Sequence, residues 1–207
     1  MEPKSMDIQT FFDPATSTFS HLVWDPDTLD AAIVDPVLDY DPKSGRTTTD
    51  NADKVIDAMS AKQLKLRYIL ETHAHADHLT AAPYLKSRCG GQIAIGAKIR
   101  QVQEVFRGIF NLRDLATDGS QFDVLLTEGD TLSLGSLSIE VLDTPGHTPA
   151  CISYRIDDAI FIGDTFFSPG YGTARADFPG GNAEALYNSL QRLLSYPDGT
   201  RLYLCHD

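Results

Sequence analysis

The stretch THAHADH, residues 72–78, holds three of the six histidines of the chain and one aspartate. It follows the apolar run LRYIL, residues 66–70, with Glu71 between the two. That run predicts a buried strand, so the polar cluster begins where a strand ends. Imidazole and carboxylate groups are the usual ligands of zinc and non-haem iron, and burying so many of them without a cation would be costly. The stretch therefore predicts a metal site at a strand end.

Three further polar clusters stand directly after apolar runs. TPGHT (144–148) follows IEVLD, GDT (163–165) follows AIFI, and CHD (205–207) follows LYL. Strand ends can meet at one edge of a sheet, where loops carry functional side chains on a rigid scaffold. Five of the six histidines fall in these four places. We therefore expect one shared site, and we expect His21, inside an earlier strand, to be an ordinary packed residue.

The spacing within THAHADH predicts two adjacent metal positions. If residues 72–77 leave the strand as an irregular loop, His73 and His75 point the same way. Asp77 and His78 then turn toward a neighbouring position, whereas a helical zinc motif would need histidines at i and i+4. The later clusters supply the remaining ligand candidates, His147, Asp164 and His206.

Length and composition favour one domain with a sizeable core, over residues 1–207. A net charge of −12 and a pI near 4.7 argue against a nucleic-acid partner, which needs a basic surface. The three cysteines lack CxxC spacing, so we expect neither a disulfide framework nor a zinc ribbon, and a reduced, cytoplasmic setting. No apolar stretch approaches the roughly 18 residues of a membrane span, so no membrane association is expected.

Strand and helix patterns alternate along the chain. Apolar runs at 19–24 and 31–34 flank a turn-forming DPDTLD and predict a hairpin that opens the fold. Helical patterns follow at 47–63, 79–91, 97–106 and 182–195, with strands between them and up to residue 204. Such alternation implies an α/β layered domain with both sheet faces covered. Residues 107–121 show no period and predict a loop, whose role the sequence leaves open.

Taken in order, THAHADH, PGHT, GDT and CHD resemble the ligand motifs of the metallo-β-lactamase superfamily. The resemblance covers almost the whole chain and implies that family's αβ/βα four-layer sandwich, with the metal site at one edge of two facing sheets. Superfamily members continue for some tens of residues beyond the last motif histidine. The resemblance therefore also implies that the C-terminal part of the domain is missing after Asp207.

The superfamily contains hydrolases and oxygenases, so the fold does not choose the reaction. Resemblance to glyoxalase II thioesterases implies Zn(II), two per chain, with Asp164 bridging the two ions. The ligands of one ion would be His73, His75 and His147. The ligands of the other would be Asp77, His78 and His206. Resemblance to the persulfide dioxygenases implies Fe(II), one per chain, held by His73, His147 and Asp164 as the catalytic triad. In that family the other motif residues are present outside the iron's ligand set.

The segment YGTARADFPGG, residues 171–181, favours the dioxygenases. It resembles their glycine-flanked R-x-D-F segment, and particularly the bacterial sulfide-detoxifying branch that is often linked to a rhodanese. The match implies that Arg175 pairs with a glutathione carboxylate through its planar, two-pronged guanidinium, and that Asp177 orients it. A surface ion pair between these two residues is the alternative. Tyr171 is either a wall of the thiol pocket or a packing residue.

The function expected from this resemblance is that of a non-haem Fe(II) persulfide dioxygenase. Its substrates would be glutathione persulfide and O2, and its products sulfite and glutathione, in sulfide detoxification. The resemblance also suggests a homodimer. The alternative is a dinuclear zinc thioesterase of the glyoxalase II kind.

Overall fold

The computed structural model describes residues 6–207. Its strands are β1 (Asp7–Asp13), β2 (Thr18–Trp24), β3 (Asp30–Val34), β4 (Val37–Asp41), β5 (Arg46–Thr48), β6 (Lys65–Leu70), β7 (Leu79–Thr80), β8 (Gln92–Gly96), β9 (Val124–Leu126), β10 (Thr131–Leu134), β11 (Leu137–Asp143), β12 (Ile152–Ile156), β13 (Ala159–Phe161) and β14 (Arg201–Tyr203). Its helices are α1 (Asp50–Lys62), α2 (Ala82–Cys89), α3 (Ile99–Ile109) and α4 (Ala183–Leu194).

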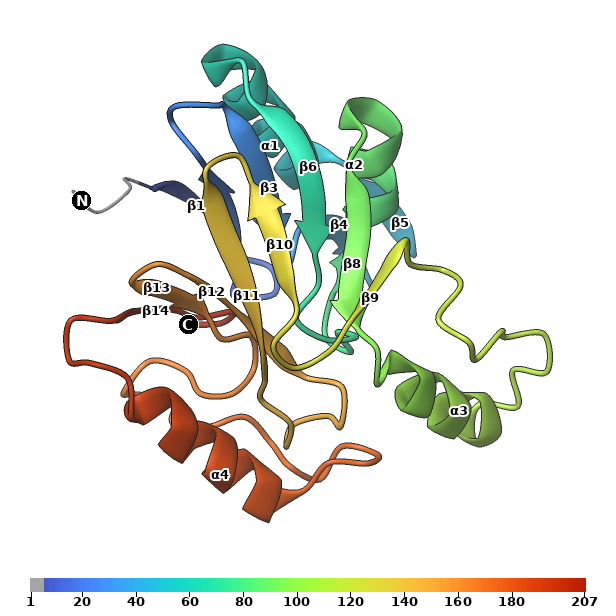
Figure 1. The fold of residues 1–207 in the computed structure, drawn as a ribbon. Helices are drawn as coiled ribbons and strands as arrows, with labels where there is room; N and C mark the ends of the chain where they lie inside the picture. Colours follow the sequence, from blue (N-terminus) through green and yellow to red (C-terminus); the bar gives the residue numbers. More distant parts are fainter. Residues whose placement is uncertain (1–5) are drawn as a thin grey trace.

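Two main sheets face each other (Figure 1). The first has the order β1-β2-β3-β6-β8-β9, and the second has the order β10-β11-β12-β13-β14. A small third sheet joins β5, β4 and β7. In the first sheet, β3, β6, β8 and β9 are parallel. The final residues of β3, β6 and β8 are apolar and buried, because both faces of the sheet are covered there.

The hydrophobic core lies in three layers of contact. Between the sheets, side chains such as Leu70, Val141 and Tyr154 form one cluster. On the outer face of the first sheet, α1 and α2 pack against Ile33 and its neighbours. On the outer face of the second sheet, Leu193 of α4 packs against strand residues. Helices therefore cover both outer faces, as the sequence pattern predicts.

The strand directions gather the polar loops at one edge. Strand β11 is antiparallel to β12, and β12 is antiparallel to β13, so β11 and β13 run the same way. Strand β14 is parallel to β13. The segments that follow β11, β13 and β14 therefore leave the second sheet at the same end, facing the segments that follow β3 and β6.

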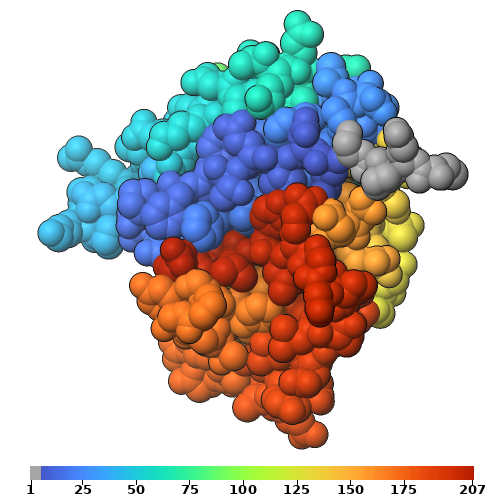
Figure 2. Space-filling view, turned by 90° about the vertical axis from the view of Figure 1, so that its left-hand side faces the viewer, coloured from blue at the N-terminus to red at the C-terminus, as the bar shows by residue number. Residues whose placement is uncertain are grey.

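The two ends of the described chain lie side by side. Figure 2 shows the C-terminal segment in red against the N-terminal segment in blue. The backbone N–H of Phe19 donates to the carbonyl of Cys205 at 2.7 Å, and Thr18 forms a bridge with His206. His21 is buried, and its Nε2 lies 2.8 Å from the Leu204 carbonyl. The prediction that His21 is a packed residue is confirmed.

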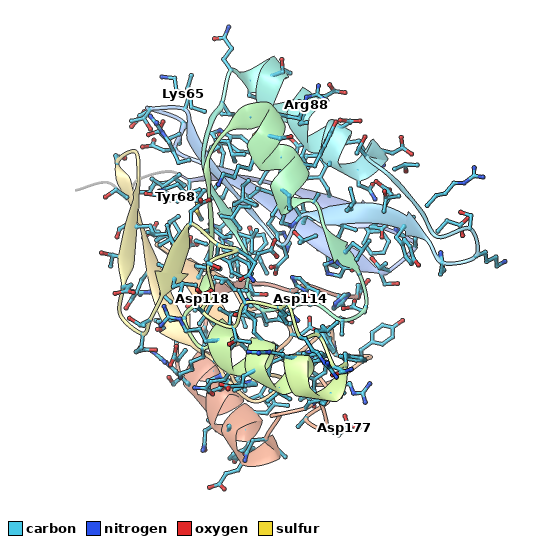
Figure 3. All side chains as sticks on the ribbon, turned by 90° about the vertical axis from the view of Figure 1, so that its right-hand side faces the viewer. Lys65, Tyr68, Arg88, Asp114, Asp118 and Asp177 are labelled. Atoms are coloured by element: carbon cyan, nitrogen blue, oxygen red, sulfur yellow. The ribbon has the colours of Figure 1, made fainter. Side chains whose placement is uncertain are left out.

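Two sequence expectations need correction or completion. The hairpin of β2 and β3 is present, but it does not open the fold, because β1 precedes it and pairs antiparallel with β2. The sequence IQTFF of β1 mixes exposed and half-buried positions, so its apolar signal is weak. The loop predicted over residues 107–121 begins later than expected, because α3 continues to Ile109; residues 110–123 contain neither helix nor strand. Figure 3 shows Asp114 and Asp118 of this segment beside α3.

No helix formed by residues 6–207 has both the length and the apolar character needed to cross a membrane. The three cysteines are all free in the structure.

Candidate metal centre

Three predicted ligands meet between the sheets. His73 follows β6, His147 lies between β11 and β12, and Asp164 follows β13. One ligand atom of each lies within 4.8 Å of those of the other two. His73 Nε2 is 3.7 Å and His147 Nε2 is 3.8 Å from Asp164 Oδ2. The structure thus brings together two imidazoles and one carboxylate, and all three side chains are buried.

Hydrogen bonds determine which ring nitrogen of each histidine is free. The Thr72 hydroxyl donates to Asp35 Oδ2 at 2.8 Å, so it accepts from His73 Nδ1 at 3.0 Å. His147 Nδ1 donates to the Arg175 carbonyl at 2.9 Å. In both rings Nε2 therefore keeps its lone pair and faces Asp164. Fixing the tautomer through the other nitrogen is how proteins usually prepare histidine for a metal.

A second group of ligand atoms lies next to the first. Asp77, His78 and His206 place one atom each within 4.8 Å of one another. His206 Nδ1 lies 3.2 Å from the Ser17 carbonyl, and its Nε2 lies 3.2 Å from Asp77 Oδ2 and 3.4 Å from Asp164 Oδ1. Asp164 therefore faces both groups with different oxygens, as the bridging position of a two-metal site requires.

His75 is held differently from its neighbours. Its Nε2 donates to Asp35 Oδ1 at 3.2 Å and lies 3.3 Å from Glu71 Oε2. Its free nitrogen is therefore Nδ1. His75 belongs to a ligand group with His78 and Cys205, and to another with Asp35 and Glu71. The sequence expectation that His73 and His75 share one metal position stays a prediction; the centroids of the two rings lie 4.2 Å apart.

Several buried polar atoms of the site lack a hydrogen bond. Among residues 6–207, the buried side-chain atoms without a hydrogen-bond partner are Glu71 Oε2, His73 Nε2, His75 Nδ1, His78 Nε2 and Asp164 Oδ1. Leaving such atoms unpaired costs free energy, and native proteins rarely do so. All of them belong to the ligand groups, and a bound cation would satisfy the imidazole nitrogens directly. The donor set therefore fits a metal ion.

Electrostatics favour the neutral form of His73 and His78 and the charged form of His75. Burial, together with the nearby His75 and His147, lowers the pKa of His73 well below its ordinary value. Burial and His75 lower the pKa of His78 to about 4. Burial opposes the charged form of His75 as well, but Asp35 and Glu71 outweigh it and raise the pKa of His75 well above its ordinary value. Neutral imidazole is the form that binds metals.

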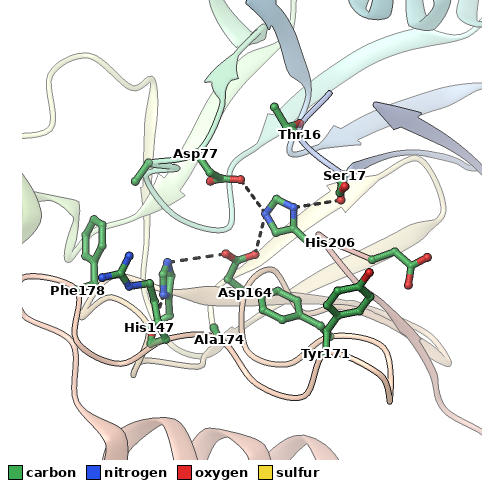
Figure 4. Close-up of a pocket in the computed structure, with 13 residues that line it drawn as sticks. Thr16, Ser17, Asp77, His147, Asp164, Tyr171, Ala174, Phe178 and His206 are labelled. Carbon is green, nitrogen blue, oxygen red and sulfur yellow. Dashed lines mark hydrogen bonds and ion pairs between the residues drawn. The ribbon is translucent and has the colours of Figure 1, made fainter. Parts of the chain in front are cut away.

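An open pocket of about 530 Å³ leads to the ligands. Figure 4 shows His147, Asp164, Asp77 and His206 converging on it, with Tyr171 and Phe178 on its walls. The Phe178 ring lies 5.4 Å from the His147 ring, between centroids. The pocket therefore offers a substrate both polar ligands at its base and apolar walls around them.

The predicted substrate residues lie at the mouth of this pocket. Arg175 and Tyr171 line it. Arg175 forms a two-pronged pair with Asp177, with Nε to Oδ1 at 2.7 Å and Nη2 to Oδ2 at 3.1 Å. Both side chains are largely exposed, and Figure 3 shows Asp177 at the surface. The structure thus contains the surface pair that the sequence left as an alternative, positioned where Arg175 can also reach a substrate. Tyr171 is exposed, which excludes a role in core packing.

Sequence reasoning missed two buried carboxylates of the site, Asp35 and Glu71. Asp35 stands directly after the apolar strand β3 and Glu71 directly after β6, which is the same signal that identified the other clusters. Asp35 also adopts a left-handed backbone conformation, with φ 48°, an uncommon state for a residue with a side chain. The missed wall residues Thr16 and Ser17 come from the turn between β1 and β2, and nothing in the sequence marks them.

The two facing sheets and the clustered ligands at their edge define a metal-binding enzyme domain. The chain belongs to the metallo-β-lactamase superfamily, whose family model matches residues 13–206. The predicted four-layer αβ/βα fold is confirmed by this match and by a solved relative. That relative is ETHE1 from Myxococcus xanthus, whose crystal structure has a TM-score of 0.79 and 32% identity, covering 97% of this chain and 76% of that one.

Curated relatives carry names from both reaction classes. A probable metallo-hydrolase of Burkholderia pseudomallei is 55% identical over 213 residues, covering 98% of this chain and 72% of the relative. The human mitochondrial persulfide dioxygenase ETHE1 is 29% identical over 205 residues, covering 97% of this chain and 68% of the relative. Against the β-lactamase hydrolase-like protein of Agrobacterium fabrum, the chain spans 46% of the relative's length.

Proposed function

We propose that the chain is a non-haem Fe(II) persulfide dioxygenase that acts on glutathione persulfide. The observation that carries this proposal is the group of His73, His147 and Asp164, with both Nε2 lone pairs and the carboxylate facing one point. Two histidines and one carboxylate on one face are the ligand set of non-haem Fe(II) oxygenases. The R-x-D-F segment at the pocket mouth and the similarity to persulfide dioxygenases support the same reaction.

The reaction needs one water: glutathione persulfide, O2 and H2O give glutathione and sulfurous acid, with the outer sulfur oxidised and O2 reduced. A bound Fe(II) would supply the redox chemistry with dioxygen and a position for the persulfide sulfur. The chain's own residues orient this site. Thr72 and the Arg175 carbonyl hold the His73 and His147 rings, while Phe178 beside His147 shields one side of the pocket from water.

The geometry at the pocket mouth supports a carboxylate-bearing substrate. The Arg175 guanidinium already forms a two-pronged bond to the Asp177 carboxylate. An exposed pair of this kind contributes little free energy, so a substrate carboxylate can replace Asp177 at low cost. Glutathione carries two carboxylates, and Arg175 would bind one of them.

The direct test is oxygen consumption by anaerobically purified, Fe(II)-loaded protein after addition of glutathione persulfide. Iron and zinc are counted in the same sample. We expect rapid oxygen uptake, sulfite as product and one iron per chain. Stoichiometric zinc with thioester hydrolysis, and no oxygen uptake by the iron-loaded protein, would contradict the proposal.

A dinuclear zinc thioesterase is the second candidate, and the position of Asp164 between the two ligand groups favours it. Asp77→Ala separates the two candidates. The variant removes a ligand of the second group only, so a dioxygenase should keep one iron per chain and its oxygen uptake within a few-fold. A dinuclear hydrolase should lose at least ~100-fold in thioesterase activity, because loss even of an outer partner of a metal ligand costs roughly 10- to 100-fold.

Replacement of Arg175 by alanine tests the substrate assignment. The backbone carbonyl that holds His147 is retained, so iron binding should be unchanged. We expect KM for glutathione persulfide to rise roughly several-fold, since the variant loses its two-pronged bond to the substrate carboxylate, with kcat changed much less. Arg201→Ala is the matched control, because Arg201 pairs with Asp158 at 2.6 Å elsewhere on the surface. An equal KM in both variants would remove Arg175 from the substrate site.

A further inference from the structure

An aromatic side chain of the pocket wall is held in place from outside the pocket. Phe178 lines the pocket, and its ring lies 5.4 Å from the His147 ring, between centroids. The same ring also lies 5.3 Å from the ring of Phe106 in α3. Phe106 is half-buried and packs against the apolar cluster that joins Ile95 of β8 to Val102 of α3. Phe178 therefore lies between a candidate metal ligand and the packed face of a helix.

The backbone around Phe178 leaves its ring little freedom. The Phe178 carbonyl accepts from the Gly181 N–H at 2.6 Å, and three residues earlier the Arg175 carbonyl accepts from His147 Nδ1 at 2.9 Å. A Cβ added at Gly181 would meet the carbonyl oxygens of His147 and Phe178, each at 2.9 Å. The segment from Arg175 to Gly181 is therefore packed directly against the loop of His147, and Phe106 limits how far the Phe178 ring can turn away from the pocket.

An aromatic wall at this place distinguishes organic from inorganic sulfur compounds. Sulfur bonded to carbon gains from contact with an aromatic ring, and the gain corresponds to roughly 2- to 10-fold in affinity. The face of the ring is electronegative, so a small inorganic anion gains nothing from it. A substrate that places its carboxylate at Arg175 and its outer sulfur at the metal ligands has its carbon chain between them, in the pocket that Phe178 lines.

We infer that Phe178 is a specificity-determining residue, which selects organic persulfides over inorganic hydrogen persulfide, and that Phe106 is the positioning residue that holds it. The inference rests on the proposed function, because it concerns which persulfide the site accepts. Phe178 contacts the methylene groups and the inner sulfur of the bound substrate. Phe106 is not among the residues that line the pocket, so it acts through Phe178.

Binding without turnover tests the wall directly. Reduced glutathione is titrated calorimetrically, in the absence of oxygen, into protein loaded with whichever of Fe(II) and Zn(II) it retains. We expect Phe178→Ala and Phe106→Ala to weaken glutathione binding roughly 2- to 10-fold at unchanged metal content, and Phe106→Leu to restore most of the loss. Val105→Ala is the matched control and should bind as wild type does, because Val105 precedes Phe106 in α3 but is 37% exposed.

Circular dichroism shows whether each variant has folded, and Phe178→Leu, which keeps an apolar side chain, replaces Phe178→Ala if the alanine variant has not. Equal affinity for glutathione in wild type and in the folded Phe178 variant would overturn the inference. A full loss in Phe106→Leu, or the same loss in Val105→Ala, would remove Phe106 as the positioning residue.

Selectivity is measured by oxygen uptake of iron-loaded protein with glutathione persulfide, and with inorganic hydrogen persulfide as alternative substrate or competitor. We expect Phe178→Ala to raise KM for glutathione persulfide roughly 2- to 10-fold, with kcat changed much less, and to leave the half-maximal concentration of the inorganic anion unchanged. Equal losses for both compounds would overturn the inference. The expected binding losses in a protein that consumes no oxygen would instead refute the dioxygenase, while still supporting contact of Phe178 with the glutathione chain.

Discussion

Replacement of Asp164 by alanine is expected to remove iron and to reduce oxygen uptake by more than ~100-fold. Asp164 faces His73 and His147 with one oxygen and His206 with the other. Loss of a direct ligand should exceed the roughly 10- to 100-fold cost of losing an outer partner. Iron per chain after dialysis and oxygen uptake with glutathione persulfide measure the effect.

The Asp164→Ala variant should fold without metal at least as stably as metal-free wild type. Burial raises the pKa of Asp164, against the lowering effect of His206, which means that its charged form costs free energy in this place. The metal-free variant should therefore have a Tm equal to or above that of metal-free wild type. Asp158→Asn is the control, since Asp158 lies in an exposed pair with Arg201. Full iron content in Asp164→Ala would show that the metal lies elsewhere.

Replacement of Gly146 by alanine is expected to unfold the domain or to destabilise it by about 3 kcal/mol or more. Gly146 has φ 144°, a region that residues with a side chain rarely adopt. An added Cβ would overlap the backbone N and Cα of Leu186 in α4. Backbone atoms of a packed helix cannot rotate aside, so the loop that carries His147 must move away.

Denaturant unfolding of the metal-free proteins measures this effect without a contribution from metal binding. Gly170→Ala is the matched control, because a Cβ there meets nothing within 4 Å and the φ of Gly170 is not positive. We expect the control to change the free energy of unfolding by no more than about 0.5 kcal/mol. Equal unfolding midpoints for the two variants would refute the proposed packing of Gly146 against α4.

Much of the candidate site can be read from the sequence because its ligands obey a local rule. Each lies in the loop that follows a strand, and parallel strands release their loops at the same sheet edge. Asp35 and Glu71 obey the same rule and were nevertheless missed, since a lone carboxylate after a strand carries little information. Strand β1 was missed because its half-exposed positions give no clear alternation.

The sequence by itself determined the kinds of ligand, their order and the strands that carry them, because those depend on neighbours along the chain. The tertiary structure decided which nitrogen of each imidazole is free. His206 bonds to Ser17, 189 residues away, His147 to the carbonyl of Arg175, and His75 to Asp35, 40 residues away. A ring nitrogen can bind a metal only if its proton sits on the other nitrogen. That choice is made by acceptors that folding alone brings into contact.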